Sequence, residues 1–349
     1  MEDNLNRYIP SFESDYTNGV HTKVLQRIID TNNETLTGYG LDHYCNSAIQ
    51  KIKETCKTPQ ADVHLLVGGT QTNSIVISSL LRDSEGVIAA TSGHVSVHEA
   101  GAIEYTGHKV LTVDHKDGKI AHTTVKNYLE GFYADESLEH MVYPGMLYIS
   151  QPTEYGTLYS REELKELSTV CKRYNIPLFI DGARLGYGLM SNECDHSIED
   201  IAQLADVFYI GATKVGALCG EAVVFTKNNT PRHFRTLVKQ HGALLAKGRL
   251  LGVQFDSLFT DNLYFEISRH AIDMAELLKK VLKSKGCKFY LESPTNQQFI
   301  IMSNEQYNSI KEKIKLGVWE QIDENNLVVR LVTSWSTTKE DIIALEELL

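Results

Sequence analysis

Two charged residues follow apolar runs in the middle of the chain. Asp181 ends the run PLFID, and Lys214 follows the run VFYIGAT. A buried carboxylate needs a cation or several donors, and a partly desolvated lysine becomes a better nucleophile. Each residue also has an ordinary interpretation: Asp181 could pair with Arg184 or cap a helix, and the Lys214 amine could reach the surface.

A third feature is the segment GGTQTNSIVISSLLR, which begins at Gly68 directly after an apolar run. Glycines let an anion approach the backbone, and the first turn of a helix offers free N–H groups and the positive end of its dipole. The segment therefore favours a phosphate site at Gly69 and Thr70. By itself it fits equally well a tight turn in which the threonine caps the helix.

Together the three features match the needs of an enzyme that uses pyridoxal 5′-phosphate (PLP). Lys214 would bind the cofactor as a Schiff base, and Asp181 would keep the ring nitrogen protonated. Gly69, Thr70 and Thr213 would hold the phosphate. The sequence thus predicts PLP chemistry on an amino acid.

These residues must be positioned by a parallel sheet, because short β-rich runs alternate with stretches long enough for a helix. The segment 161–174 is amphipathic, with Ser160 and Glu163 at the spacing of a capping box. In such open sheets, functional residues gather beyond the carboxyl ends of the strands. We predict a large α/β domain with a mostly parallel seven-stranded sheet, whose strands are 64–67, 87–91, 110–113, 146–149, 177–180, 207–210 and 222–225.

The pattern changes after about residue 251. A long helical stretch is followed by alternating strands and a last helix, which indicates a smaller α+β domain at the C-terminus. We expect an N-terminal segment 1–20, a large domain 21–250 and a small domain 251–349. The elements expected in the small domain are a helix 262–285, strands 288–291, 298–302 and 327–332, and a helix from 339.

The composition is that of a globular protein, with 42% hydrophobic and 23% charged residues among 349. The net charge of −11 disfavours attraction to nucleic acid or anionic lipid. The sequence has no apolar run long enough to span a bilayer and no recognisable export signal. Its six cysteines form no Cys-x-x-Cys pair, so a reducing cytoplasm is the expected location.

The ordered motifs SDY, GYGLD, GGTQTN, SGHVSVHEAG, DGARL, ATK and VRLVTSW are spread over residues 14–335. In this order they resemble the low-specificity L-threonine aldolase and β-eliminating lyase group of PLP-dependent, fold type I enzymes. The resemblance implies a PLP-dependent transferase-like fold, a small amino acid as substrate, and a homodimer or homotetramer. It also implies active sites at the subunit interfaces.

The same resemblance implies roles for further residues. His94 would stack on the cofactor ring. Ser14, Arg184 and Arg330 would bind the substrate carboxylate, for which the guanidinium fork is well shaped. Tyr39 would reach the cavity, either that of its own chain or that of the neighbouring subunit.

Two positions depart from the family pattern. Glu154 stands where these enzymes commonly carry a histidine near the substrate hydroxyl. Leu245 stands where an arginine would bind the partner subunit's phosphate, and Lys239, Lys247 and Arg249 are candidates to replace it. These departures concern the substrate more than the cofactor.

A metal site is not expected. His94 and His98 have a spacing that could bind zinc on a helix, with Glu99 beside them. However, a convincing third ligand is missing, and His94 already has the stacking role. His98 is expected to pack or to form a hydrogen bond.

The reaction remains open between several outcomes. The leading hypothesis is cleavage of the Cα–Cβ bond of a β-hydroxy amino acid, giving glycine and an aldehyde. The same site could instead eliminate a β-substituent and release a keto acid and ammonia, and an aminotransferase is a third possibility. A non-catalytic module for a phosphate ligand would leave Lys214 and Asp181 unexplained, and no G-x-G-x-x-G follows the first strand.

Overall fold

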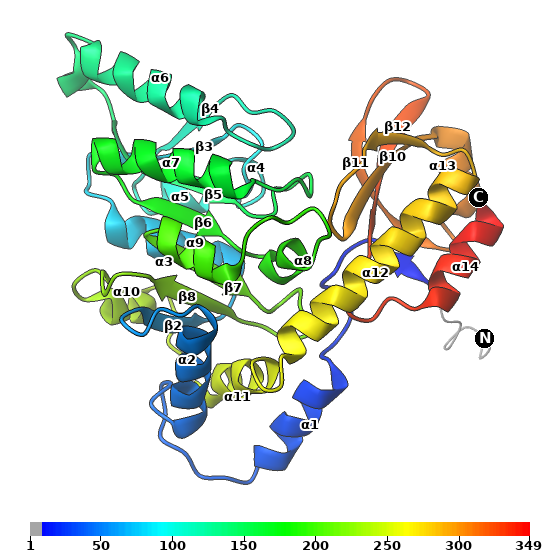
Figure 1. Cartoon of the computed structure of the whole chain (residues 1–349), viewed down its shortest axis with the longest axis horizontal. Coiled ribbons are helices and arrows are strands. Elements are labelled where there is room, and N and C mark those ends of the chain that lie inside the picture. Colours follow the sequence, from blue (N-terminus) through cyan, green and yellow to red (C-terminus); the bar gives the residue numbers. More distant parts are fainter. Residues whose placement is uncertain (1–8) are drawn as a thin grey trace.

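The computed structural model describes residues 9–349, which form two sheets with their covering helices (Figure 1). The larger sheet has the order β2-β8-β7-β6-β5-β3-β4. Strand β8 is antiparallel to both neighbours, and the other pairs are parallel. The predicted mostly parallel, seven-stranded sheet is therefore confirmed. Its strands are β2 (Asp62–Leu66), β3 (Glu85–Ala90), β4 (Val110–Val113), β5 (Tyr143–Ser150), β6 (Leu178–Asp181), β7 (Val207–Gly211) and β8 (Glu221–Phe225).

Helices follow most of these strands. Helix α7 (Arg161–Tyr174) has the predicted bounds, because Ser160 and Glu163 form a complete capping box and Asn175 ends the helix in the left-handed conformation. The other helices before the small domain are α1 (Thr22–Thr31), α2 (His43–Thr55), α3 (Gly69–Leu80), α4 (His94–Val97), α5 (Ala102–Tyr105), α6 (His122–Ala134), α8 (Leu185–Leu189), α9 (Ile198–Leu204), α10 (Phe234–Gln240) and α11 (Arg249–Leu258), with a short 3-10 turn at Leu138–His140.

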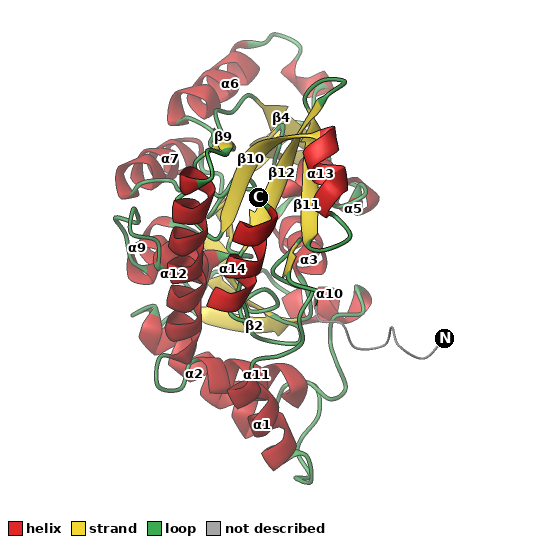
Figure 2. Ribbon diagram, turned by 90° about the vertical axis from the view of Figure 1, so that its right-hand side faces the viewer, coloured by secondary structure: helices red, strands yellow, loops and turns green. Residues whose placement is uncertain are grey.

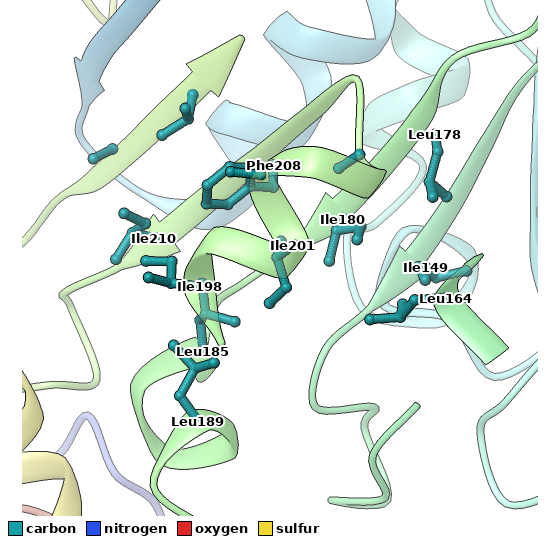
Figure 3. Packing of buried hydrophobic residues seen from close by; sticks show 14 of the residues in the cluster. Ile149, Leu164, Leu178, Ile180, Leu185, Leu189, Ile198, Ile201, Phe208 and Ile210 are labelled. Atoms are coloured by element: carbon teal, nitrogen blue, oxygen red, sulfur yellow. The ribbon is translucent and has the colours of Figure 1, made fainter. Parts of the chain in front are cut away.

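The core explains why the central strands are apolar throughout. On one face of the sheet, Ile180 and Phe208 pack with Ile201 of α9 and Leu164 of α7 (Figure 3). Alternate side chains of the same strands point to the other face, where Phe179 packs in a second cluster. Strands that are buried on both faces read as continuous hydrophobic runs, which is why the sequence pattern located them.

The second sheet has the order β1-β11-β12-β10-β9, and helix α12 (Leu263–Ser284) runs along it beside α14 (Lys339–Leu348) (Figure 2). Its strands are β9 (Lys288–Leu291), β10 (Gln297–Ser303), β11 (Lys315–Gln321) and β12 (Asn326–Val332), and α13 (Asn304–Ile310) follows β10. Strand β11 was not predicted. Neither was β1 (Ser11–Phe12), which pairs with β11 in parallel and so brings the N-terminal segment to this sheet. The domain bounds themselves stay a prediction.

Two glycines allow the loops after β6 and β7 to approach each other closely. A Cβ atom on Gly182 would lie 1.9 Å from the Tyr209 carbonyl oxygen, and one on Gly211 would lie 2.5 Å from the Ala183 carbonyl oxygen. Any side chain at either position would collide with backbone. The close approach places Asp181 and the segment that leads to Lys214 next to each other.

None of the helices within residues 9–349 has the length and apolar character needed to cross a membrane.

Candidate active site

One cavity, with about 400 Å³ of empty space, lies at the carboxyl ends of the central strands and beside the first turn of α3. The residues predicted from the sequence that line it are Gly69, His94, Glu154, Asp181, Arg184 and Lys214. Ser150, Pro152, Thr153, Ala183 and Tyr209 complete the lining. The fold therefore brings together side chains that are far apart in the sequence.

Asp181 is buried and saturated with donors. The Asn73 amide and the Tyr148 hydroxyl donate to its Oδ2 at 3.0 and 2.6 Å, while the Tyr209 hydroxyl and one backbone N–H donate to Oδ1. Burial alone would raise the pKa of Asp181, but nearby His94 and the tyrosine hydrogen bonds hold the pKa below its ordinary value. Asp181 is thus a carboxylate at neutral pH and can stabilise a protonated ring nitrogen.

A chain of hydrogen bonds joins Asp181 to His94. The Asn73 amide donates to both Asp181 and Glu99, and Glu99 Oε1 lies 2.7 Å from His94 Nδ1. Burial lowers the pKa of His94, but the hydrogen bond to Glu99 and the charge of Asp181 raise it above its ordinary value. His94 is therefore held in a fixed orientation and favoured as a cation.

Sequence reasoning missed four residues of this network. Tyr148 and Tyr209 were treated as strand residues, although a tyrosine hydroxyl inside an apolar run needs a buried partner. Asn73 and Glu99 lay inside the quoted motifs, but their partners could not be inferred from neighbouring residues. The tyrosines in otherwise apolar strands were the signal that could have been used.

Lys214 lies three residues after β7 and is half-buried. Within residues 9–349 its Nζ atom forms neither a hydrogen bond nor an ion pair. Burial and the neighbouring Arg184 lower the pKa of Lys214, although Asp15 and Glu221 oppose the shift. An amine without partners and with lowered basicity is suited to attack a carbonyl carbon.

Arg184 does not pair with Asp181, the ordinary alternative considered from the sequence. Its Nε and Nη2 donate to the two carboxylate oxygens of Asp15 at 2.6 and 2.9 Å. The Asn296 amide also donates to Asp15 at 3.0 Å. The pair is buried and bidentate, so the Arg184 guanidinium is held firmly at the cavity wall.

Ser14 and Arg330 lie close to this pair. The Ser14 hydroxyl is buried without a hydrogen-bond partner in the described part of the chain. Within residues 9–349 the hydrogen bonds of Arg330 are both long, at 3.4 Å to the Gln297 side chain and to the Glu13 carbonyl, and its guanidinium lies 5.4 Å from the centre of the Trp319 ring. Burial and nearby Arg184 lower the pKa of Arg330. An arginine with weak partners beside another arginine is a suitable site for an anion.

Glu154 lies in the loop after β5 and faces the cavity. The Ser150 hydroxyl and the His94 backbone N–H donate to its Oε1 at 2.6 and 2.9 Å. Burial raises the pKa of Glu154, and the hydrogen bond from Ser150 opposes the rise. The loop after β5 thus presents a half-buried carboxyl group with raised pKa to the cavity, and its correspondence to the family's histidine stays a prediction.

The three residues predicted to bind phosphate, Gly69, Thr70 and Thr213, differ from one another in their surroundings. Helix α3 starts at Gly69, and no side chain of residues 9–349 caps its N-terminus, so its first N–H groups remain open to an anion. Thr70 is exposed in the first turn. Thr213 does not line the cavity, and its hydroxyl lies 2.9 Å from Glu221 Oε1.

Tyr39 does not reach this cavity within the chain. It has a positive φ of 59° and lines a different pocket, together with Leu245. The Lys239 amine lies 4.9 Å from its ring centre. Arg249 donates to backbone carbonyls of Thr31 and Glu34, and Lys247 lies beside it in another surface hollow. Which residue binds a partner's phosphate stays a prediction.

The histidine pair considered for zinc has ring centres 5.7 Å apart, and His98 also packs edge-on against Trp319. In the range 9–349 no group of three or more His, Cys, Asp or Glu side chains could hold a metal ion.

The family model described as Beta-eliminating lyase matches residues 12–305. The chain therefore belongs to the β-eliminating lyase family, whose members are PLP-dependent enzymes of fold type I, and it is a lyase. Among solved structures, threonine aldolase from Leishmania major is similar, with a TM-score of 0.93 and 43% identity over 97% of this chain and 98% of that chain.

Two curated relatives are named low specificity L-threonine aldolase. The protein from a Pseudomonas strain is 28% identical over 86% of this chain and 87% of its own length, and that from Pseudomonas aeruginosa is 25% identical over 95% and 94%. An aspartate aminotransferase from Thermus thermophilus, at 14% identity and a TM-score of 0.68, shares the fold alone.

Proposed function

We propose that this lyase binds PLP at Lys214 and cleaves a small β-hydroxy amino acid between Cα and Cβ, giving glycine and an aldehyde. The observation that carries the proposal is the convergence of an unpaired lysine and an ionised aspartate on one cavity. The names of the relatives support the threonine aldolase type of reaction.

The chain has a suitable group for each part of the cofactor. The uncapped N-terminus of α3, at Gly69 and Thr70, would hold the phosphate, with Thr213 as an additional donor. Asp181 would accept a hydrogen bond from the ring nitrogen, and His94 would lie against the ring. When bound, PLP withdraws electrons from the Cα atom of an attached amino acid.

The substrate carboxylate would bind to Arg184 and Arg330, with the unpaired Ser14 hydroxyl as a third donor. Two guanidinium groups can fix the direction of the amino acid, so that one bond to Cα is selected for cleavage. The Asp15 contact pre-orients Arg184 before the substrate arrives.

Glu154 would take the proton from the substrate β-hydroxyl. A base for this step must be near the cavity and ionised at the working pH. Glu154 faces the cavity, and its raised pKa makes it a better proton acceptor than an ordinary carboxylate. Its hydrogen bonds to Ser150 and to the His94 backbone would keep it in place.

The proposal includes a homodimer or homotetramer in which Tyr39 reaches the neighbouring subunit's cavity. Tyr39 is 43% exposed and lies outside the cavity of its own chain, as such a role requires. A cytoplasmic location is also proposed, and it is supported by six cysteines that are all free thiols.

The cofactor test uses the purified protein with added PLP. After borohydride reduction, mass spectrometry should find the pyridoxyl label on Lys214, and Lys214→Ala should remain folded but unlabelled. Labelling of a different lysine would contradict the assignment.

The reaction test offers L-threonine, L-allo-threonine, L-serine and L-cysteine in separate incubations. Glycine with acetaldehyde from either threonine isomer is the expected result. A keto acid and ammonia, without glycine, would show that β-elimination is the reaction.

A further inference from the structure

Glu221 is a buried carboxylic acid that the proposed reaction does not use. It begins β8, where it is opposite Leu66 of β2 and Gly211 of β7. The chain leaving β2 leads to Gly69, and the chain leaving β7 leads to Thr213. Glu221 therefore lies between the two arms of the proposed phosphate site.

The contacts of Thr213 limit where its hydroxyl hydrogen can point. The hydroxyl oxygen accepts a hydrogen bond from the Gly220 N–H at 3.0 Å and lies 2.9 Å from Glu221 Oε1, whereas the Gly220 carbonyl oxygen is a longer contact at 3.5 Å. If Glu221 is ionised, the single hydrogen of Thr213 points to the carboxylate, which is the shorter and the charged acceptor. If Glu221 is protonated, its own O–H can donate to the second lone pair of Thr213, which frees the threonine hydrogen.

The surroundings favour the protonated form. Glu221 is 3% exposed, and its Oε2 has no hydrogen-bond partner within residues 9–349. Burial raises the pKa of Glu221 to about 8, although the charge of Lys214 opposes this shift. The titratable groups whose charges interact with that of Glu221 are Lys214, Asp181, Tyr209, Tyr264 and Cys219. A phosphate nearby would add negative charge and favour the neutral acid further.

We propose that neutral Glu221 donates a hydrogen bond to Thr213 and thereby turns the Thr213 hydroxyl hydrogen towards the phosphate group of PLP. This inference rests on the proposed function, because Thr213 needs a bound phosphate as its acceptor. Glu221 is a positioning residue, since it acts through Thr213. The phosphate group should therefore contribute less to binding when Glu221 loses its proton.

The experiment compares PLP with pyridoxal, which lacks the phosphate. Dissociation constants of both are measured on the whole protein by absorbance at pH 7 and pH 9. The ratio of the two constants isolates the phosphate contribution, and it cancels the titration of Lys214, which affects both ligands. With a pKa of about 8 for Glu221, the advantage of PLP over pyridoxal should fall about tenfold between these pH values.

Three single variants and one double variant sharpen the test. Glu221→Gln keeps a donor at every pH, so the advantage of PLP should become independent of pH. Thr213→Val should lower this advantage at pH 7 to about its pH 9 value and so make it independent of pH, and adding Glu221→Gln to it should change nothing more. Glu85→Gln makes the same substitution at the start of β3, the opposite end of the parallel strands, and should retain the tenfold fall.

Melting temperatures establish that each variant is folded, and Thr213→Val carries the test if Glu221→Gln is not. A tenfold fall that persists in Glu221→Gln, or a wild-type advantage that does not change with pH, would overturn the inference. Failure of the proposed function gives a different result, in which neither ligand labels Lys214 at any pH.

Discussion

Arg184 donates two hydrogen bonds to Asp15, and the Asp15 side chain is fully buried. Asp15 comes from the segment after β1, whereas Arg184 follows β6 of the other sheet. The contact therefore joins the N-terminal segment, which pairs with the smaller sheet, to the cavity wall formed by the larger one.

Replacing Asp15 by asparagine should weaken both the fold and substrate binding. Arg184 would lose its charged partner while still buried, which costs about 3 kcal/mol for pairs of this kind. We expect a similar loss in the free energy of unfolding in urea, and a KM for the amino acid that is at least about tenfold higher, because a guanidinium with freedom to move binds a carboxylate less well. The matched control is Asp273→Asn, at an exposed position of α12. Lower stability with an unchanged KM would show that the pair is only structural.

Asp181→Asn should retain the cofactor and lose most of the activity. A neutral amide cannot stabilise a protonated ring nitrogen, so electron withdrawal by the cofactor weakens. We expect kcat to fall by about 100-fold or more, while the borohydride label on Lys214 persists. A kcat close to that of the wild type would mean that another group controls the ring nitrogen.

Arg330→Ala should act on the substrate and not on the cofactor. Loss of a hydrogen bond to a charged group costs about 1.5 to 3 kcal/mol, which corresponds to a rise in KM of about 10- to 100-fold. The dissociation constant of PLP should remain within about twofold of the wild-type value. Arg330→Lys keeps the charge and should restore part of the binding, whereas parallel loss of substrate and cofactor affinity would indicate a structural role.

Glu154→Gln should change the pH dependence of the reaction. A general base works only when ionised, so the rate falls as the pH drops below the pKa of the base. Because burial raises the pKa of Glu154, the acidic limb of the kcat profile should lie at a higher pH than an ordinary glutamate would produce. In the variant this limb should disappear and kcat should fall by about 100-fold. A profile and a rate like those of the wild type would identify Glu154 as a carboxylate without a role in catalysis.

The sequence located most of the strands and a few of the helices, because their signals are local. The strands of the larger sheet are continuous apolar runs, and α7 carries its own capping box, so their positions were predicted to within a few residues. Strand β11 was missed because KLGVWEQ is mostly exposed and has no apolar run. Strand β1 has only two residues and becomes a strand only by pairing with β11, about 300 residues further along the chain.

The sequence by itself determined which residues stand at the strand ends, and so which chemistry the chain can support. Lys214 and Asp181 were recognisable because a charged side chain at the end of a buried strand is costly unless a partner stabilises it or a function requires it. Only the tertiary structure decided which partner satisfies each charge. Arg184 binds Asp15 and not Asp181, Asn73 links Asp181 to Glu99, and Thr213 binds Glu221. The order of strands in the sheets sets which strand ends meet, and the long-range partners then follow from hydrogen-bond geometry that no local pattern records.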